Sequence, residues 1–597
     1  MKPGNDMHSD NYLPVLVLLP FLAAVASSLG IRNLMIATFL IIGSLVFLVV
    51  LKADVAVQDR VFPLAIGCMS LSLILSSNLV SNNLSGADIQ VEFNIFQQVS
   101  KAGFWRPEPM VYYGSGSAPY YSALSISILP TIIREVTWLP DATTLQFGSS
   151  ILWALGPVVL YKLYRKFLEP RHAFVSVFLF MSYPTFYGEM IALARQEIAE
   201  LLLIVLLCFL FYGTVRTTRA RALIVTVLTF GIITAHYSIG YLTIAILGVS
   251  WIAPRISRKV SSLSMGLLLI GSVVMAAGWY ALAAGGVAAL GLANFVSFTA
   301  NHFLEDFINP NSRPTMVLQA LGLASVTPGL LHDLNRVTQY SVLFCMVVGF
   351  LVFLGKNQKS LTERQMIPLT VAGFCLLFAS VIVPYFAAAL NLSRFYSFAL
   401  LFVSPCFAYG AKGIESIFRS MVASLRGSIF RVQIHSTTLK AWLLIATILF
   451  SYFLFTSGWA WAVGMDTPTS PILDRQRMAT SPDLRVKASY FNAYIIAEDI
   501  AGTYWLTSHL APDRFLCADY ASRYHVLTSY GGFSRESISA VPYACRLGNY
   551  VYLDILYTRY GIALQAPGNW TSYDLQLDTA LGSRIFSNGA TTIYSGG

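Results

Sequence analysis

Residues 61–93 read VFPLAIGCMSLSLILSSNLVSNNLSGADIQVEF, and this stretch decides the class of fold. Residues 61–80 contain no charged side chain, and a helix of that length crosses a bilayer core of about 30 Å. A polar segment follows at once, and it carries Asp88 and Glu92. The stretch therefore predicts a membrane-spanning helix that delivers two carboxylates to one membrane surface.

Similar apolar runs recur along the whole chain. Of its 597 residues, 56% are hydrophobic and only 11% are charged, whereas soluble domains carry about 25% charged residues. We therefore predict an α-helical polytopic membrane protein with about thirteen transmembrane helices. The predicted spans are residues 12–30, 34–51, 61–80, 143–161, 173–187, 192–213, 222–236, 238–253, 262–290, 340–354, 366–390, 395–411 and 441–463.

Positive charge gathers on alternate loops, and this pattern predicts the orientation. Lys162, Arg165, Arg219, Arg255 and Lys356 are examples from the loops on one side. Since Lys and Arg on short loops favour the cytoplasmic face, we expect a plasma-membrane protein with a cytoplasmic N-terminus and an extracytoplasmic C-terminal region. These loops also explain the net charge of +10, so we expect no nucleic-acid partner.

Composition divides the chain into two parts. Residues 1–463 hold all the predicted spans, with two long external loops at residues 81–142 and 291–339. Residues 464–597 have an ordinary globular composition and alternate between helix and strand patterns. This alternation predicts a small extracytoplasmic α/β domain.

Asp88 and Glu92 are the strongest candidates for catalysis. Their i, i+4 spacing places both carboxylates on one face of a helix, which suits a general base and a partner that positions an acceptor hydroxyl. The alternative is structural. Ser85 and Asp88 fit a capping box, in which Asp88 only satisfies backbone donors at a helix start, and spacing alone leaves both interpretations open.

Charged side chains also stand at the external ends of two predicted spans. Arg195, Glu197 and Glu200 open one span, and Arg394 opens another. Charges at membrane depth are costly and often functional, and arginine binds phosphate through two parallel hydrogen bonds. The structural alternatives are a mutual Arg–Glu pair and an arginine that reaches the lipid headgroups.

His236 and Tyr237 lie at a turn that the sequence places below the outer surface. A short, largely apolar stretch separates Arg221 from Pro254, yet the charge pattern requires two crossings there, so each helix is short. A recessed turn is tolerated only inside protein or in a wet cavity. His236 is suited there to bind a phosphate or an acceptor; the alternative is a His–Tyr pair in the aromatic belt.

Two further residue groups are candidates for a metal site and for a disulfide, and the sequence decides neither. Helical spacing brings His302 and Asp306 together beside Glu305, but the spacing fixes no third ligand for a divalent metal. The sequence therefore requires no cofactor. Cys517 and Cys545 lie in the predicted external domain, where they form a disulfide or remain two free thiols.

Taken together, these features resemble the GT-C superfamily of membrane glycosyltransferases, which combines many spans, an acidic residue in the first large external loop and often a soluble C-terminal domain. The acid follows a third span here rather than a first, and a DxD pair is absent, so the metal requirement stays open. Four short elements of the sequence also resemble those of an uncharacterised prokaryotic membrane family that is known mainly from archaea. The elements are Gly86-Ala87-Asp88 with Glu92, Ala194-Arg195-Gln196-Glu197, Ala235-His236-Tyr237-Ser238 and Ser393-Arg394-Phe395.

The resemblance implies an inverting glycosyltransferase that takes a sugar from a polyprenyl-phosphate donor in the membrane. Asp88, with Glu92, would be the catalytic group. Arg195, Arg394 and His236 would bind the donor phosphate. The acceptor would be a glycan, a lipid or a protein at the outer membrane face.

The resemblance also suggests further residues near such a site. Glu197, Tyr237, Tyr113 and His302 are pocket candidates, and residues 122–138 match the family's surface helices. Two other functions would need similar spans. The alternatives are a transporter or flippase of lipid-linked saccharides and a non-enzymatic cell-envelope assembly protein.

Overall fold

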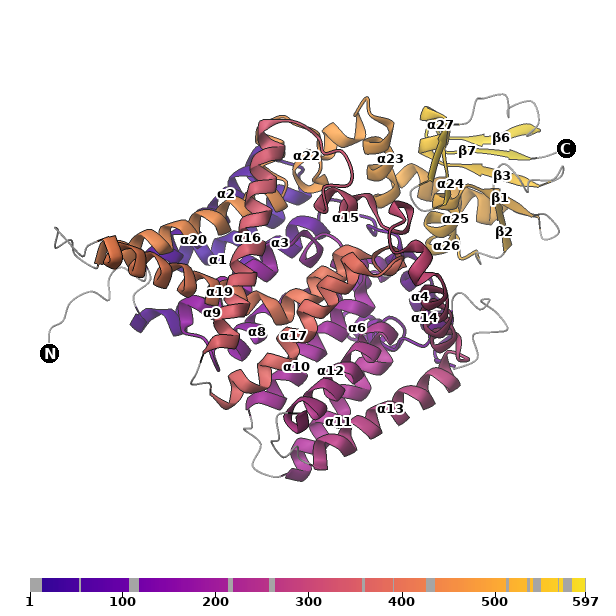
Figure 1. Ribbon diagram of the computed structural model, residues 1–597. Coiled ribbons are helices and arrows are strands. Elements are labelled where there is room, and N and C mark those ends of the chain that lie inside the picture. The colour runs from indigo at the N-terminus through magenta and orange to yellow at the C-terminus, as the bar shows by residue number, and fades with distance from the viewer. Residues whose placement is uncertain are drawn as a thin grey trace.

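Helices make up most of the protein, and the strands are confined to its C-terminal part (Figure 1). The computed structural model describes residues 13–52, 55–106, 118–212, 218–256, 263–356, 360–389, 391–425, 435–511, 515–533, 537–540, 549–566, 569–572 and 582–595. The helices of the first half are α1 (Leu13–Ser28), α2 (Arg32–Lys52), α3 (Val55–Asn78), α4 (Asp88–Ala102), α5 (Ala118–Tyr121), α6 (Ile128–Thr137), α7 (Asp141–Trp153), α8 (Gly156–Tyr164), α9 (Pro170–Ser182), η3 (Pro184–Phe186), η4 (Met190–Ala192), α10 (Ala194–Tyr212), α11 (Thr218–Ala235), α12 (Tyr237–Ile256) and α13 (Leu263–Ala283).

The second half continues the helical bundle and then changes to a mixed region. Its helices are α14 (Val287–Asp306), η5 (Pro310–Ser312), α15 (Thr315–Ala320), α16 (Leu330–Gly355), α17 (Leu361–Ile382), α18 (Phe386–Ala389), α19 (Leu392–Leu425), α20 (His435–Thr456), α21 (Trp459–Val463), α22 (Pro471–Ala479), α23 (Leu484–Ala493), α24 (Ala497–His509), α25 (Tyr520–Tyr524), α26 (Val526–Ser529) and α27 (Ile555–Tyr560). The strands are β1 (Leu516–Ala518), β2 (Ile538–Ala540), β3 (Tyr550–Leu553), β4 (Ile562–Ala566), β5 (Asn569–Ser572), β6 (Ser583–Ser587) and β7 (Thr592–Ser595).

The long helices confirm the predicted membrane class. Among the described residues, eight helical segments are long and apolar enough to cross a membrane, judged by length and composition. Three shorter apolar helices accompany them, at Pro14–Ser28, Tyr237–Val249 and Trp442–Thr456. The protein is therefore a multi-pass membrane protein, while the total of about thirteen spans stays a prediction.

Small residues allow a very close contact between α16 and α19. A Cβ added to Gly349 would lie 1.7 Å from the backbone oxygen of Cys406, and one added to Gly410 would lie 2.0 Å from that of Cys345. Only glycine fits at such distances, so the two backbones touch directly, as small residues permit between helices in lipid. This contact fixes α19, whose N-terminal end carries Arg394.

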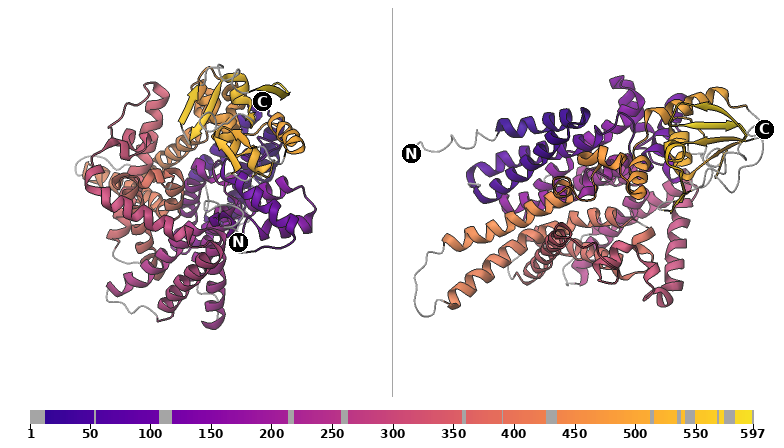
Figure 2. Two further views of the ribbon diagram at one scale, coloured as in Figure 1. Left: turned by 90° about the vertical axis from the view of Figure 1, so that its right-hand side faces the viewer. Right: turned by 90° about the horizontal axis from the view of Figure 1, so that it is seen from above.

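The C-terminal strands gather at one end of the helical bundle (Figures 1 and 2). The larger sheet has the order β2-β1-β3-β7-β6. β1 pairs in parallel with β2 and β3, whereas β7 pairs antiparallel with β3 and β6. Helices α24 to α27 alternate with these strands, so the expected small α/β region is present.

Two segments differ from their predicted boundaries. The apolar surface helix expected over residues 122–138 begins at Ile128, because residues 122–127 form turns. Part of the loop expected at residues 291–339 belongs to α14, which is itself a candidate span by length and composition. Gly285 and Gly286 both have positive φ, 56° and 75°, and such a backbone favours glycine; they separate α14 from α13.

Candidate active site

Asp88 is the first residue of α4, and its carboxylate does not cap that helix. The N-cap residue is Ala87, and no side chain caps the helix start. The hydroxyl of Ser85 instead donates to the backbone oxygen of Asn83. The capping interpretation of Asp88 is therefore wrong, and its side chain is available for other partners.

Gly86 brings the start of α4 against the segment that carries Arg195. Its φ of 102° lies in the region that favours glycine. A Cβ on Gly86 would lie only 2.3 Å from the Cβ of Ala192 in η4. Since Arg195 follows three residues after Ala192, this contact sets how closely Asp88 approaches the guanidinium.

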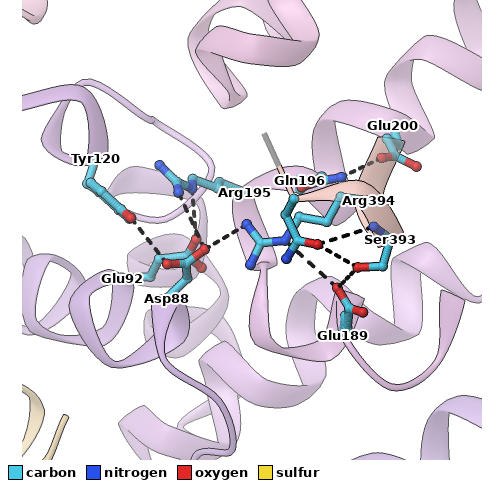
Figure 3. Close-up of polar contacts among 10 residues, drawn as sticks. Asp88, Glu92, Tyr120, Glu189, Arg195, Gln196, Glu200, Ser393 and Arg394 are labelled. Atoms are coloured by element: carbon cyan, nitrogen blue, oxygen red, sulfur yellow. Dashed lines mark hydrogen bonds and ion pairs between the residues drawn. The ribbon is translucent and has the colours of Figure 1, made fainter. Parts of the chain in front are cut away.

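The carboxylate of Asp88 lies between two arginines that are distant in sequence (Figure 3). Nη1 of Arg394 donates to Oδ2 of Asp88 at 3.0 Å. Nη2 of Arg195 lies 3.8 Å from the same oxygen. The hydroxyl of Tyr120 donates to Oδ1 at 3.2 Å, so both carboxylate oxygens have partners.

Arg195 is almost completely buried, and three groups around it offset the cost of burying its charge. Its Nε lies 3.1 Å from Oε1 of Glu92, whose side chain is fully buried. Its guanidinium carbon lies 3.7 Å from the centre of the Tyr120 ring and 5.8 Å from that of Tyr237. A buried charge needs such pairing, and the cation–π contacts add to it.

Arg394 has a second carboxylate on its other side. Its Nε lies 4.0 Å from Oε2 of Glu189, and Ser393 donates its hydroxyl to the same oxygen at 2.7 Å. The side chain of Arg394 is 31% exposed. Unlike Arg195, it therefore keeps contact with the solvent-accessible side of the site.

Asp88, Arg195, Tyr120 and Arg394 line a cavity of about 340 Å³. The N-terminal turns of α10, α12 and α19 and the first residue of α4 all contribute to its wall. Helix N-termini present unpaired backbone N–H groups and a partial positive charge, which together with two arginines suits an anion. The lining residues are Asp88, Tyr120, Arg195, Gln196, His236, Tyr237, Ser238, Ile239, Leu242, Asn391, Arg394, Phe395 and Phe398.

The two carboxyl groups of α4 have opposite pKa shifts. Burial alone would raise the pKa of Asp88, but the guanidinium groups of Arg195 and Arg394 hold it below its usual value. Burial raises the pKa of Glu92 to about 7, although Arg195 favours its ionised form. Asp88 is therefore ionised at neutral pH, while Glu92 titrates close to neutrality.

A second, apolar cavity adjoins the first. It has a volume of about 130 Å³ and lies between α12, α17 and α19. Leu242 and Phe398 line both cavities, so the charged cavity and the apolar one are neighbours. The remaining lining residues are Ala245, Ile246, Val249, Leu369, Ala372, Gly373, Leu376 and Phe402.

Five residues expected at the site from the sequence do line the charged cavity: Asp88, Arg195, His236, Tyr237 and Arg394. The rings of His236 and Tyr237 stack at 5.2 Å between centroids, and Nδ1 of His236 accepts from the backbone N–H of Ile239 at 3.4 Å. The predicted turn between α11 and α12 is thus part of the cavity wall.

Among the described residues, the candidates Glu92, Glu197 and His302 do not line it. Glu92 lies behind Asp88 and contacts Arg195, so its geometry is that of a positioning group. Glu197 accepts from the hydroxyl of Ser150 at 2.9 and 3.1 Å. Glu200 accepts from Gln196 at 2.7 Å, so neither acid forms the mutual pair with Arg195 that the sequence left open.

The candidate metal ligands of α14, His302, Glu305 and Asp306, each have other surroundings in the structure. His302 pairs through Nδ1 with the backbone oxygen of Phe298 at 2.9 Å, and Asp306 accepts from Asn309 and Tyr385, each at 2.7 Å. Glu305 is exposed. Across the described ranges, no group of three or more His, Cys, Asp or Glu side chains is arranged to bind a metal.

Two candidate residues lie outside the described residues. Tyr113 lies outside them, and so does Cys545. Cys517 is disulfide-bonded. The pairing of Cys517 with Cys545 stays a prediction.

Four further residues contact or line the site without having been predicted there from the sequence: Tyr120, Glu189, Gln196 and Asn391. Gln196 stands beside Arg195 in a motif already singled out, so proximity would have found it. Asn391 stands three residues before Arg394, so proximity to that arginine would have found it as well. Tyr120 and Glu189 carry no local signal, because only the folded chain brings them to the arginines.

Residues 221–597, more than half of the chain, match the family described as "Predicted membrane protein (DUF2206)". The chain belongs to this family. Residues 131–280 of this DUF2206 protein also match the family described as "Dolichyl-phosphate-mannose-protein mannosyltransferase", which confirms the predicted resemblance to the GT-C superfamily.

The crystal structure of ArnT from Cupriavidus metallidurans bound to undecaprenyl phosphate is among the solved structures that match the chain, with 11% sequence identity and a TM-score of 0.46. The similarity covers 90% of the DUF2206 chain and 98% of that chain. No curated protein sequence matches the chain.

Proposed function

We propose that this protein is a membrane glycosyltransferase that moves a sugar from a polyprenyl-phosphate donor to an acceptor hydroxyl at the outer membrane face. One observation carries the proposal: the carboxylate of Asp88 lies between Arg195 and Arg394 in a cavity that adjoins an apolar one. The match to the mannosyltransferase family over residues 131–280 supports the same reaction class.

The two arginines are suited to bind the donor phosphate. Guanidinium groups bind phosphate oxygens through two parallel hydrogen bonds, and the helix N-termini around the cavity add positive potential. As the bond to the sugar breaks, negative charge grows on the phosphate, and fixed positive groups stabilise that charge. Arg195 is held rigidly by Glu92 and Tyr120, so it needs little reorganisation during the reaction.

Asp88 is suited to act as the general base. It removes the proton from the acceptor hydroxyl, whose oxygen forms a bond to the anomeric carbon while the bond to the phosphate oxygen breaks. The attack comes from the face opposite the phosphate, so the configuration inverts. Donor phosphate competes with Asp88 for the hydrogen bond of Arg394, and its binding therefore frees one carboxylate oxygen for the acceptor.

The apolar cavity supports a lipid-linked donor over a nucleotide-linked one. Leu242 and Phe398 join it to the phosphate cavity, and its other walls are aliphatic or aromatic. A hydrocarbon chain gains free energy when it leaves water for such a surface. The charged groups come from one end of α4, α10 and α19, which favours an enzyme over a flippase, whose charges should follow a path to both faces.

The orientation is part of the proposal. Positive loops at Lys162, Arg219 and Arg255 favour a cytoplasmic N-terminus. The cavity and the C-terminal sheet then face the outside. The acceptor is a glycan, lipid or protein hydroxyl at that surface.

Purified protein tests the proposal with a panel of radiolabelled polyprenyl-phosphate sugars and a cell-envelope acceptor extract. Wild-type protein should transfer label from at least one donor, and Asp88→Asn should abolish transfer because an amide takes up no proton at neutral pH. Glu305→Gln is the matched control, since Glu305 is an exposed acid on α14. Native-rate transfer by Asp88→Asn would rule out the mechanism.

A further inference from the structure

The segment that leads into α4, the helix that begins with Asp88, is neither helix nor strand. It follows α3 at Asn78 and precedes α4 at Asp88. Val80, Leu84 and Ser85 are buried within it. Buried backbone groups need hydrogen-bond partners, and the source of these partners determines what holds Asp88 in place.

The C-terminal region supplies them along one side of the segment. The backbone N–H of Gly86 donates to the backbone oxygen of Ala493 at 2.7 Å. Ser85 and Tyr494 form an antiparallel β-bridge, and Asn83 donates from its side chain to the backbone oxygen of Ile495 at 3.0 Å. The segment before Asp88 is thus paired with the connection between α23 and α24, much as one strand pairs with another.

Tyr530 makes a second connection, just after α26. Its hydroxyl accepts from the backbone N–H of Leu84 at 3.3 Å, and its ring lies 5.6 Å from that of Phe93 in α4. The same tyrosine packs against two hydrophobic clusters, one around Leu84 and Phe93 and the other around Leu527. Tyr530 therefore links the core of the catalytic helix to the core of the C-terminal region.

On its opposite side the segment meets the membrane bundle. Gly86 packs so closely on Ala192 that no Cβ fits between them. The start of α4 is consequently fixed between η4 and the C-terminal region. Asp88 follows two residues after this fixed point and contacts Arg195 and Arg394.

We propose that the C-terminal region, through Ala493 to Ile495 and Tyr530, positions Asp88 against the two arginines. This inference rests on the proposed catalytic role of Asp88 for its kinetic consequences, but its structural part does not. Tyr530 is a positioning residue, because it contacts Leu84 and Phe93 and does not line the cavity. It also gives the C-terminal region a role in the transfer step.

The proposal predicts a specific kinetic pattern. The contacts of Tyr530 with Leu84 and Phe93 do not involve the elements that carry Arg394 and His236. The affinity for the donor should therefore change little. Displacement of the base from the acceptor should instead lower kcat, since a shift of about 1 Å costs up to about 100-fold in rate. The effect of one lost hydrogen bond should be smaller, about tenfold.

Tyr530→Phe tests this pattern, since it removes the hydroxyl and keeps the ring against Phe93. Asn83→Ala is a second variant that weakens the same contact from the other side. Tyr340→Phe is the matched control, because it removes a hydroxyl from an exposed tyrosine on α16. Each full-length protein is compared with wild type by thermal unfolding, by steady-state kinetics and by hydrogen–deuterium exchange of peptides that cover residues 79–96 and 391–400.

Tyr530→Phe and Asn83→Ala should speed exchange in residues 79–96 and not in residues 391–400, with kcat lowered about tenfold and donor KM within about twofold. Unchanged exchange in residues 79–96, or a rise in KM at constant kcat, would overturn the proposal. The exchange measurement needs no sugar transfer. If wild type transfers no sugar, the proposed function fails, whereas faster exchange in both variants still supports the positioning of this segment.

Discussion

Removal of Arg394 separates the catalytic role of the site from its contribution to stability. In the structure Nη1 of Arg394 donates to Asp88 at 3.0 Å, and its Nε lies 4.0 Å from Glu189. Its side chain is 31% exposed. Exposed or half-exposed ion pairs contribute about 0–1 kcal/mol to stability, so Arg394→Ala should fold almost as well as wild type.

The effect of Arg394→Ala on catalysis should be far larger. In the proposed reaction, Arg394 is one of two guanidinium groups that stabilise the leaving phosphate, and loss of one such donor typically lowers the rate about 100- to 1000-fold. Arg394→Lys keeps the charge but loses the paired hydrogen bonds of guanidinium, so its rate should fall between those of the two proteins. The difference between rate loss and stability loss is the quantity to measure.

The same variant should move the pH–rate profile. Arg195 and Arg394 both hold the pKa of Asp88 below its usual value, and a general base acts only when ionised. Removal of Arg394 removes one of these influences and raises the pKa of Asp88. The acid limb of the profile should therefore shift to higher pH in Arg394→Ala.

Single-turnover transfer from a radiolabelled polyprenyl-phosphate sugar, measured across a pH series, provides the assay. Arg336→Ala is a matched control, because Arg336 on α16 has the same side-chain exposure of 31% and is also ion-paired, with Asp333. The reasoning is refuted if Arg394→Ala transfers sugar at the wild-type rate with an unshifted acid limb, or if Arg336→Ala loses as much activity.

Three further variants test other parts of the account. Gly86→Ala should lose activity, and the midpoint of its thermal unfolding should fall, because the new Cβ would meet Ala192 at 2.3 Å; a fully active, equally stable Gly86→Ala protein would show that this contact is not needed. Wild type should lose stability as pH rises from 4.5 to about 7, because Glu92 releases its proton at lower pH in the unfolded chain than in the folded one. Glu92→Gln should remove this pH dependence. Identical pH profiles of thermal unfolding in the two proteins would contradict this. Ala372→Trp should fill the apolar cavity and raise KM for long-chain donors more than for short-chain ones, as steady-state kinetics with two chain lengths will show; equal effects on both would argue against a lipid tail in that cavity.

The sequence predicted the membrane class and the most polar part of the site because both depend on local patterns. Apolar runs identify the membrane class at once, and acids or arginines next to such runs are rare enough to be noticed. Asp88, Arg195 and Arg394 were found in this way, and His236 was found from the short apolar stretch that requires a recessed turn. The structure brings all four to one cavity. Local pattern also favoured the small α/β region after residue 464.

Contacts between distant segments were beyond the reach of local pattern. Asp88 and Arg394 are 306 residues apart, and nothing in either segment specifies the other. The helical pattern of residues 490–510 gives no sign of a break, yet the structure ends α23 at Ala493 and begins α24 at Ala497. The reason is tertiary, since Tyr494 pairs with Ser85 instead of continuing the helix.

The burial of Glu92 was also unpredictable from spacing. The i, i+4 relation to Asp88 placed both acids on one face, but it did not show that one would face the cavity and the other Arg195. The contact between Glu92 of α4 and Arg195 of α10 appears only in the folded chain, and it separates the two acids. The sequence therefore supported a shared catalytic role, whereas the geometry favours Asp88 as the base and Glu92 as the group that holds Arg195.

The most direct test of the central claim is a structure of the Asp88→Asn protein with a polyprenyl-phosphate sugar bound in a lipid nanodisc. The account predicts that the phosphate lies within hydrogen-bond distance of both Arg195 and Arg394, with the lipid chain against Leu242 and Phe398. A donor phosphate bound away from both arginines would contradict it.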